Sequence, residues 1–144
     1  MPLDWWAACR KARMLLFPRH RCQMDLCIDI EFQGGLLLVT VSGTLAFKMA
    51  LRLLKQVCDA AVEKQADRIL VNMLAVDGDL TTTERYHLGV EVAAYLRQRK
   101  VSPKIAFAGK PPAADGFGVR VSQNRGVLTE MFSSEQEALN WLSK

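Results

Sequence analysis

Apolar and polar residues alternate over residues 26–33, in the pattern expected of an extended strand with one buried face. The apolar positions on that face are Leu26, Ile28, Ile30 and Phe32. The turn sequence Gln-Gly-Gly follows at 33–35, and the run "LLLVTVSG" after it places Leu37, Val39 and Val41 on one face of a second strand. Two alternating runs joined by a short turn predict an antiparallel β-hairpin.

The spacing of apolar residues changes from two to three and four over residues 45–64. The apolar set is Phe47, Leu51, Leu54, Cys58 and Ala61, and the charged set opposite is Lys48, Arg52, Lys55, Asp59 and Glu63. A stripe of this kind predicts an amphipathic helix of about five turns with one face against a core.

The rest of the chain alternates short apolar runs with helical patterns. The runs 68–73, 104–109 and 127–132 have the length and composition of strands, and 68–73 is apolar enough to be covered on both faces. A helix is predicted after each of them, over residues 81–100, 116–124 and 133–142. Their inward positions include Leu88, Val92, Tyr95 and Leu96 in the first of these helices and Ala138, Leu139 and Leu142 in the last.

The predicted order is therefore β-β-α-β-α-β-α-β-α in a single α/β domain. Strands that alternate with helices imply right-handed crossovers and a mostly parallel sheet, with the first strand added antiparallel and the helices packed on the sheet. Ligands of such sheets bind beyond the carboxyl ends of the strands. We therefore expect the loops 75–83 and 110–115 to lie at one edge and to form a binding edge.

The net charge of +4 is confined to the N-terminal segment. Residues 1–23 hold Arg10, Lys11, Arg13, Arg19 and Arg21 beside a single acid, Asp4, whereas basic and acidic residues are equal in number over 24–144. A neutral body lacks the basic surface that general nucleic-acid binding needs, so we expect no nucleic-acid partner. We divide the chain into a basic N-terminal extension, 1–23, and a domain, 24–144.

Three interpretations of the extension remain open: a loosely packed segment, a start upstream of a domain that begins at Met24, or peripheral contact with an anionic membrane. No apolar run approaches the roughly 20 residues that span a bilayer. The cysteines, Cys9, Cys22, Cys27 and Cys58, lack metal-ligand spacing. We expect free thiols in a reducing, cytoplasmic compartment.

The sequence Thr81-x-x-Glu84 matches the capping-box pattern, in which a threonine hydroxyl and a glutamate carboxylate satisfy backbone N–H groups at a helix start. The neighbouring threonines suit a second hypothesis, because a helix N-terminus also favours a phosphate. Against phosphorylation, Asp77, Asp79 and Glu84 would repel the added charge. Both interpretations begin a helix near Thr81.

Other patterns lack parts that their chemistry needs. The acidic turn 77–79 lacks the further ligands of a calcium loop, and His87 with Glu91 lacks a second histidine for a metal site. Gly-Lys at 109–110 is not a phosphate-binding loop, and Gly-x-Gly at 116–118 is not a dinucleotide fingerprint. We can name no nucleophile with a base, so we expect no catalysis, no metal and no cofactor.

Three cations lie on or near the predicted binding edge: Lys110, Arg120 and Arg125. They are candidate ligand-edge residues, and the alternative is that they are ordinary surface residues.

The element order resembles the STAS-like fold and, within it, the SpoIIAA-like bacterial proteins. The resemblance covers residues 24–144 and is carried by "ILVNMLAVDGDLTTTERYHLG", "KIAFAGKPPAADGFGVRVSQNRG" and "MFSSEQEALNWL". In anti-sigma factor antagonists, which share this fold, a partner kinase phosphorylates a serine in an Asp-Ser-Ser-Gly motif at a helix start. The corresponding region here is 81–84, which reads Thr-Thr-Thr-Glu.

The resemblance implies a candidate phosphoacceptor or partner-contact loop, made of Asp77, Asp79, Thr81, Thr82 and Thr83. It also implies a non-enzymatic, regulatory module that binds an unidentified protein partner. Because STAS-like domains are similar in topology to lipid-binding folds, a carrier of a small apolar ligand or lipid is the alternative. A homodimer is compatible with either hypothesis.

Overall fold

The computed structural model describes residues 20–23 and 26–144. The strands are β1 (His20–Gln23), β2 (Leu26–Gln33), β3 (Leu36–Thr44), β4 (Arg68–Asp77), β5 (Lys104–Ala108) and β6 (Leu128–Phe132). The helices are α2 (Phe47–Lys64), α3 (Thr82–Arg99), α4 (Phe117–Gln123) and α5 (Glu135–Leu142). From β2 to α5 the order of elements is the predicted one.

The six described strands form one sheet, in the order β1 to β6. β1, β2 and β3 are antiparallel neighbours, whereas β3, β4, β5 and β6 are parallel. The predicted fold class is confirmed, including the antiparallel hairpin. β1 adds a strand that the sequence did not predict, at the end of the segment interpreted as an extension. The membrane-contact hypothesis concerns residues 1–23, and residues 1–19 of that segment lie outside the described residues.

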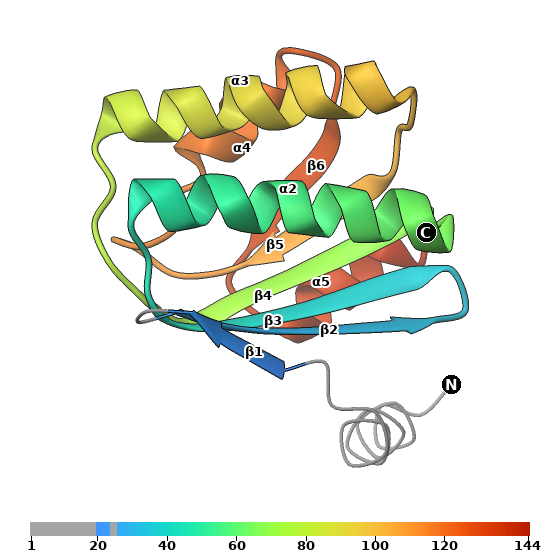
Figure 1. The fold of residues 1–144 in the computed structure, drawn as a ribbon, viewed down its shortest axis with the longest axis horizontal. Helices are drawn as coiled ribbons and strands as arrows, with labels where there is room; N and C mark the ends of the chain where they lie inside the picture. Colours follow the sequence, from blue (N-terminus) through green and yellow to red (C-terminus); the bar gives the residue numbers. More distant parts are fainter. Residues whose placement is uncertain (1–19, 24–25) are drawn as a thin grey trace.

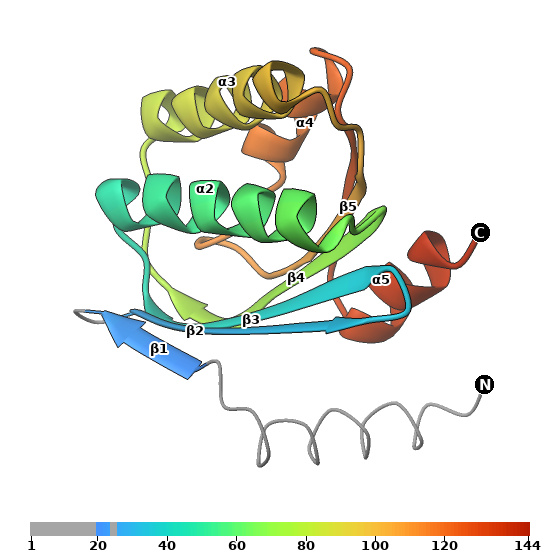
Figure 2. The same ribbon diagram turned by 45° about the vertical axis from the view of Figure 1, so that its right-hand side comes forward.

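The described helices lie on both faces of the sheet (Figure 1). α2, α3 and α4 form a layer on one side, and α5 packs on β4, β5 and β6 from the opposite side (Figure 2). Alternation along the strands sends Val39 and Val71 into the core beneath α2, while Leu38 and Leu70 face α5. β4 is therefore apolar on both faces, as its sequence predicts.

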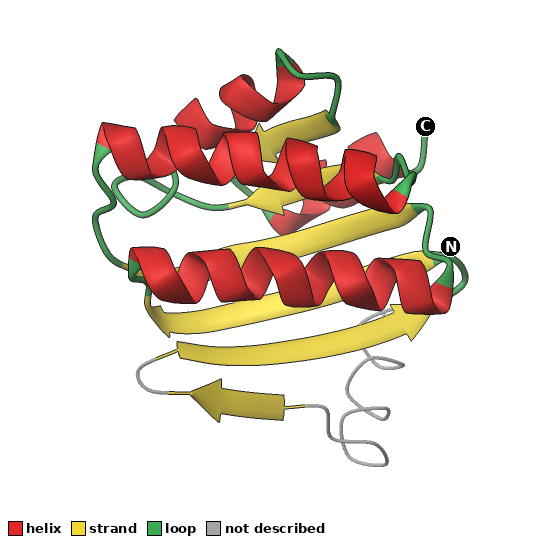
Figure 3. Cartoon of the chain, turned by 45° about the horizontal axis from the view of Figure 1, so that its top comes forward, coloured by secondary structure: helices red, strands yellow, loops and turns green. Residues whose placement is uncertain are grey.

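The orientation of α2 differs from the predicted one in detail. Its most buried positions include Leu53, Val57 and Ala61, whereas Leu51 and Leu54 from the predicted stripe are half-buried. Figure 3 shows α2 and α3 running side by side across the sheet. The predicted stripe faces this neighbouring helix, and the residues beside it face the sheet. The charged side of α2 is exposed, as predicted.

β4 is longer than the predicted strand 68–73, because it continues to Asp77. Its pairing with β3 is irregular after Asn72, where one additional β4 residue is accommodated before Ala75. The Leu74 N–H donates to the side-chain oxygen of Asn72 at 3.0 Å within this irregularity. The loop between β4 and α3 therefore covers only 78–81, and Asp77 belongs to the strand.

The cysteines differ from the prediction of free thiols at one position. Cys27 is disulfide-bonded, so that prediction is wrong for Cys27. Cys58 is free and buried; burial, together with the nearby charge of Asp59, raises the pKa of its thiol to about 12. Since the thiolate is the reactive form, Cys58 is unreactive near neutral pH. Cys9 and the side chain of Cys22 lie outside the described part of the chain.

Across residues 20–23 and 26–144, no helix combines the length and the apolar character that crossing a membrane requires.

Candidate functional site

The loops that follow β3, β4 and β5 meet at the carboxyl edge of the sheet. The Leu45 N–H donates to the carbonyl oxygen of Asp77 at 2.8 Å, which joins the first two loops. Gly78 has a φ of +128°, and a Cβ at this position would lie 2.6 Å from the carbonyl oxygen of Leu45. Both the backbone conformation and the close approach therefore require glycine at position 78.

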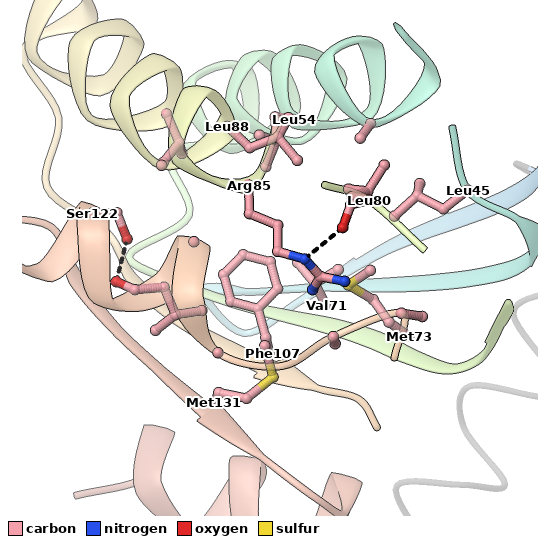
Figure 4. A pocket seen from close by; sticks show the side chains of 18 of the residues that line it. Leu45, Leu54, Val71, Met73, Leu80, Arg85, Leu88, Phe107, Ser122 and Met131 are labelled. Carbon is pink, nitrogen blue, oxygen red and sulfur yellow. Dashed lines mark hydrogen bonds between the residues drawn. The ribbon is translucent and has the colours of Figure 1, made fainter. Parts of the chain in front are cut away.

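Arg85, in the first turn of α3, joins the loop after β4 to the loop after β5. Its side chain is only 9% exposed, and Nη1 pairs with Asp115 at 2.9 Å. Nε donates to the carbonyl of Leu80 at 3.0 Å (Figure 4). Nη2 donates to the carbonyl of Pro112 and lies 3.5 Å from a carboxylate oxygen of Asp79. Such partners are needed because an unpaired buried charge is strongly destabilising.

A cavity of about 110 Å³ lies beside Arg85, between the sheet and the layer formed by α2, α3 and α4. Figure 4 shows apolar side chains around it, with Val71, Met73 and Phe107 on the sheet side and Leu54 and Leu88 on the helix side. The Arg85 side chain extends from α3 among these apolar side chains, and its guanidinium lies near Leu80, Val71 and Met73 (Figure 4).

The predicted capping box is present at the start of α3. The Thr81 hydroxyl oxygen accepts a hydrogen bond from the Glu84 N–H at 3.1 Å, and the Glu84 carboxylate accepts one from the Thr81 N–H at 2.9 Å. Thr82 and Thr83 are exposed. Thr81 thus has a structural role in the helix cap, whereas the side chains of Thr82 and Thr83 are presented to solvent.

Aromatic side chains extend the exposed surface along the first two turns of α3. Tyr86 is 42% exposed, and its ring meets that of His87 edge-on with centroids 5.9 Å apart. The His87 ring lies 6.4 Å from that of Phe47, at the start of α2. Thr82 and Thr83 precede Tyr86 and His87 by four residues each, so all four lie on one side of the helix.

The residues of the predicted contact loop and the predicted ligand edge are brought together only in part. Asp77 and Asp79 are exposed, and Asp79 is drawn to Arg85. Lys110 is exposed in the loop after β5, and Arg120 is exposed on α4. Arg125 lies against α3, where Nη2 donates to the Tyr86 hydroxyl at 2.9 Å. The three cations therefore do not converge on one point.

The polar pair on α3 that was considered as metal ligands is presented to solvent. His87 and Glu91 are exposed, and the described residues contain no group of three or more histidine, cysteine or acidic side chains that could hold a metal ion.

A second polar cluster holds α2 against α3 away from the loops. The Tyr95 hydroxyl donates to Asp59, and this hydrogen bond raises the pKa of Tyr95. Arg99 pairs with the same carboxylate at 3.4 Å. These contacts fix the separation of the two helices that form one wall of the cavity.

Arg85 and the cavity were not predicted from the sequence. The sequence did contain one indication that Arg85 is buried. Arg85 precedes Leu88 by three residues and Val92 by seven, so it falls on the apolar face of α3. A charged residue on such a face is buried only if it has partners. Those partners lie in two separate loops, and although the sequence predicts that the loops share an edge of the sheet, it does not show which of their side chains and carbonyls meet Arg85.

Comparison with known proteins identifies a fold. No protein-family model and no curated protein matches the sequence. The crystal structure of an anti-sigma factor antagonist from Mycobacterium paratuberculosis is similar, with a TM-score of 0.57 and 16% identity over 83% of this chain and 95% of that one. An uncharacterised protein from the DUF3478 family with a SpoIIAA-like fold, from Shewanella loihica PV-4, gives a TM-score of 0.49 and 15% identity, over 85% and 98% of the two chains.

These identities are low, so the similarity concerns the arrangement of the backbone. The backbone superposes on that of the compared anti-sigma factor antagonist with a TM-score of 0.57 over most of both chains. The described chain therefore has an α/β fold of the STAS-like, SpoIIAA-like type.

Proposed function

We propose that this chain is a regulatory protein-binding module and that its partner docks on the α3 contact surface. We define this surface as the exposed side chains of Thr82, Thr83, Tyr86 and His87, together with Phe47 beside them. The adjoining loop with Asp77, Asp79 and Thr81 forms its border. The function is binding and not catalysis, because no nucleophile with a positioned base occurs in the described part of this edge.

The observation that carries the proposal is the cluster of rings at an exposed helix start. Tyrosine supplies a large contact area with few rotatable bonds and is enriched among the residues that dominate binding energy. Tyr86 is 42% exposed; Arg125 donates to its hydroxyl and lies over its ring, and the His87 ring meets it edge-on. A ring that is already held loses little conformational freedom when a partner covers it.

A regulatory role is supported by the fold. The compared protein from Mycobacterium paratuberculosis is an anti-sigma factor antagonist, a name that describes action on another protein. The proposal carries this kind of activity over to the present chain as a class, regulation by protein contact, and leaves the partner's identity open. It also keeps the predicted cytoplasmic location, although the Cys27 disulfide is of a kind more common in oxidising compartments.

Phosphorylation would act on this surface through Thr82 or Thr83. Thr81 is the least suitable acceptor, because its hydroxyl oxygen already caps α3. A phosphate on Thr82 or Thr83 would sit in the first turn of a helix, where backbone N–H groups favour an anion. It would also place nearly two negative charges beside the aromatic rings, which changes what the surface can bind.

Long-chain lipid transport is the less favoured candidate. The cavity of about 110 Å³ is of the order of the roughly 150 Å³ that holds one benzene molecule in an engineered protein cavity, and this is far less than a long acyl chain needs. A whole acyl chain would need the helix layer to separate from the sheet.

The proposal is tested by quantitative comparison of the proteins that co-purify with the wild type and with three variants of the full chain from its own cells. We expect Tyr86→Ala and Thr83→Glu each to lose a specific subset of proteins that the wild type retains. Gln98→Ala is the matched control, since Gln98 is exposed on the last turn of the same helix, and its set should equal that of the wild type. Unchanged sets for both surface variants would contradict the proposal.

A further inference from the structure

We propose that the cavity beside Arg85 is a binding site for a small, neutral, apolar molecule about the size of benzene. The cavity measures about 110 Å³. An engineered apolar cavity of about 150 Å³ takes up benzene, and this pocket, which is partly open to solvent, is of the same order of size. The site is separate from the α3 contact surface, and the inference does not rest on the proposed protein-binding function.

Close contacts between the helices hold the walls of the cavity apart. α3 and α4 already touch through their backbones, because a Cβ at Gly89 would lie 2.6 Å from the carbonyl oxygen of Gly118. α4 therefore cannot move closer to α3 to fill the space. On the other side, the cluster of Tyr95, Asp59 and Arg99 fixes α2 against α3. The helix packing therefore maintains the pocket.

Part of the cavity lining consists of small residues, and larger side chains at these positions would fill the cavity. Ala50 on α2, Ala113 and Ala114 in the loop after β5, and the glycines of α3 and α4 all border the cavity. The opposite wall is formed by larger apolar side chains, among them Met73 and Phe107. A molecule in this space would contact hydrocarbon, sulfur and an aromatic ring, which together favour an apolar body.

The charges around the cavity exclude an ionised ligand. The Arg85 guanidinium at its end is already paired with Asp115 and approached by Asp79, so a ligand carboxylate would have to displace one carboxylate and face the other. A cation would face the guanidinium. The Ser122 hydroxyl donates to the Val119 carbonyl at 2.8 Å and has no second proton to offer a ligand. A neutral apolar molecule leaves all these pairs intact.

The test is a titration of the full chain with toluene, followed by NMR of the methyl groups of Val71 and Met73. We expect saturable shifts at these two residues. Ala50→Met places a longer side chain in the cavity and should weaken toluene binding at least about tenfold, because the space is then filled. Ala94→Met is the matched control, since Ala94 is exposed on α3, and it should bind toluene like the wild type.

A second filling variant, Ala113→Val, keeps the test decisive if Ala50→Met does not fold, as judged by circular dichroism. A parallel titration with benzoate tests the charge argument, and we expect no saturable shift at Val71 or Met73. The inference is overturned by any of three results. The first is that toluene does not bind saturably. The second is that a folded filling variant binds toluene as tightly as the wild type, and the third is that benzoate binds as tightly as toluene.

Discussion

Arg85 is buried, and a buried arginine is stable only when its whole guanidinium group has partners. The side chain is 9% exposed, and its three nitrogens contact two carbonyl oxygens and two carboxylates. Both carboxylates belong to residues that are themselves exposed, so their charges keep contact with water. The pairing therefore avoids burying two charges at once, and it fixes the two loops at the edge of the sheet.

Replacement of Arg85 by alanine should lower the free energy of unfolding by about 2–3 kcal/mol, because the carbonyls of Leu80 and Pro112 lose their donors and the two loops lose their link. Arg97→Ala, on the exposed side of the same helix, should change it by less than about 0.5 kcal/mol. Urea denaturation monitored by circular dichroism measures both. Equal effects for the two variants would mean that Arg85 contributes no more than a surface arginine.

At the scale of single residues, contacts between residues close in sequence could be predicted, whereas contacts between residues far apart in sequence could not. The capping box at Thr81 was predictable because its donors and acceptors lie within four residues of one another. The partners of Arg85 were not predictable, since Asp115 is thirty positions away in sequence and is brought near only by the crossover from β5 to α4. Lys110, Arg120 and Arg125 could be placed near the edge, but not in relation to one another.

At the scale of elements, the start of α3 has two parts with different roles. Thr81 and Glu84 cap the helix through reciprocal hydrogen bonds, and this is a matter of stability. Thr82 and Thr83 are exposed beside the aromatic rings, and the proposed function assigns them to binding. Because the three threonines are consecutive, single substitutions can separate the two roles.

Thr81→Ala should lower the free energy of unfolding by about 1 kcal/mol, because the Glu84 N–H loses its acceptor. Thr83→Ala is the matched control within the same turn, and it should change the stability by less than about 0.5 kcal/mol. Thermal and urea unfolding of both variants provide the measurement. A loss from Thr83→Ala as large as that from Thr81→Ala would show that the exposed threonine is also structural.

Elements with a regular pattern of apolar residues were predicted closely, whereas features that depend on packing against neighbouring elements were not. The charged side of α2 was predicted correctly. The buried face of α2 also includes Leu53 and Val57, because the helix packs on α3 as well as on the sheet. The end of β4 was placed four residues too early, since pairing with β3 resumes after the irregularity near Asn72. A sequence pattern shows how apolar a face is, and tertiary packing decides which element covers it.

At the scale of the whole molecule, the sheet brings the candidate features to one edge. The parallel order of β3, β4 and β5 makes their loops neighbours, as the crossover rule predicts. β1 could not be predicted, because its four residues lack an apolar pattern and form a strand only by pairing with β2. The cavity could not be predicted either, because it depends on the close approach of α3 and α4 at Gly89 and Gly118.

The proposal that the α3 contact surface binds a protein is tested most directly by site-specific cross-linking in the chain's own cells. A photoreactive phenylalanine analogue is placed at position 83, in the first turn of α3, or at position 98, in its last turn, and the adducts are identified by mass spectrometry. We predict one dominant protein adduct from position 83 that Tyr86→Ala weakens and that position 98 does not form. No adduct from position 83, or the same adducts from both positions, would contradict the proposal.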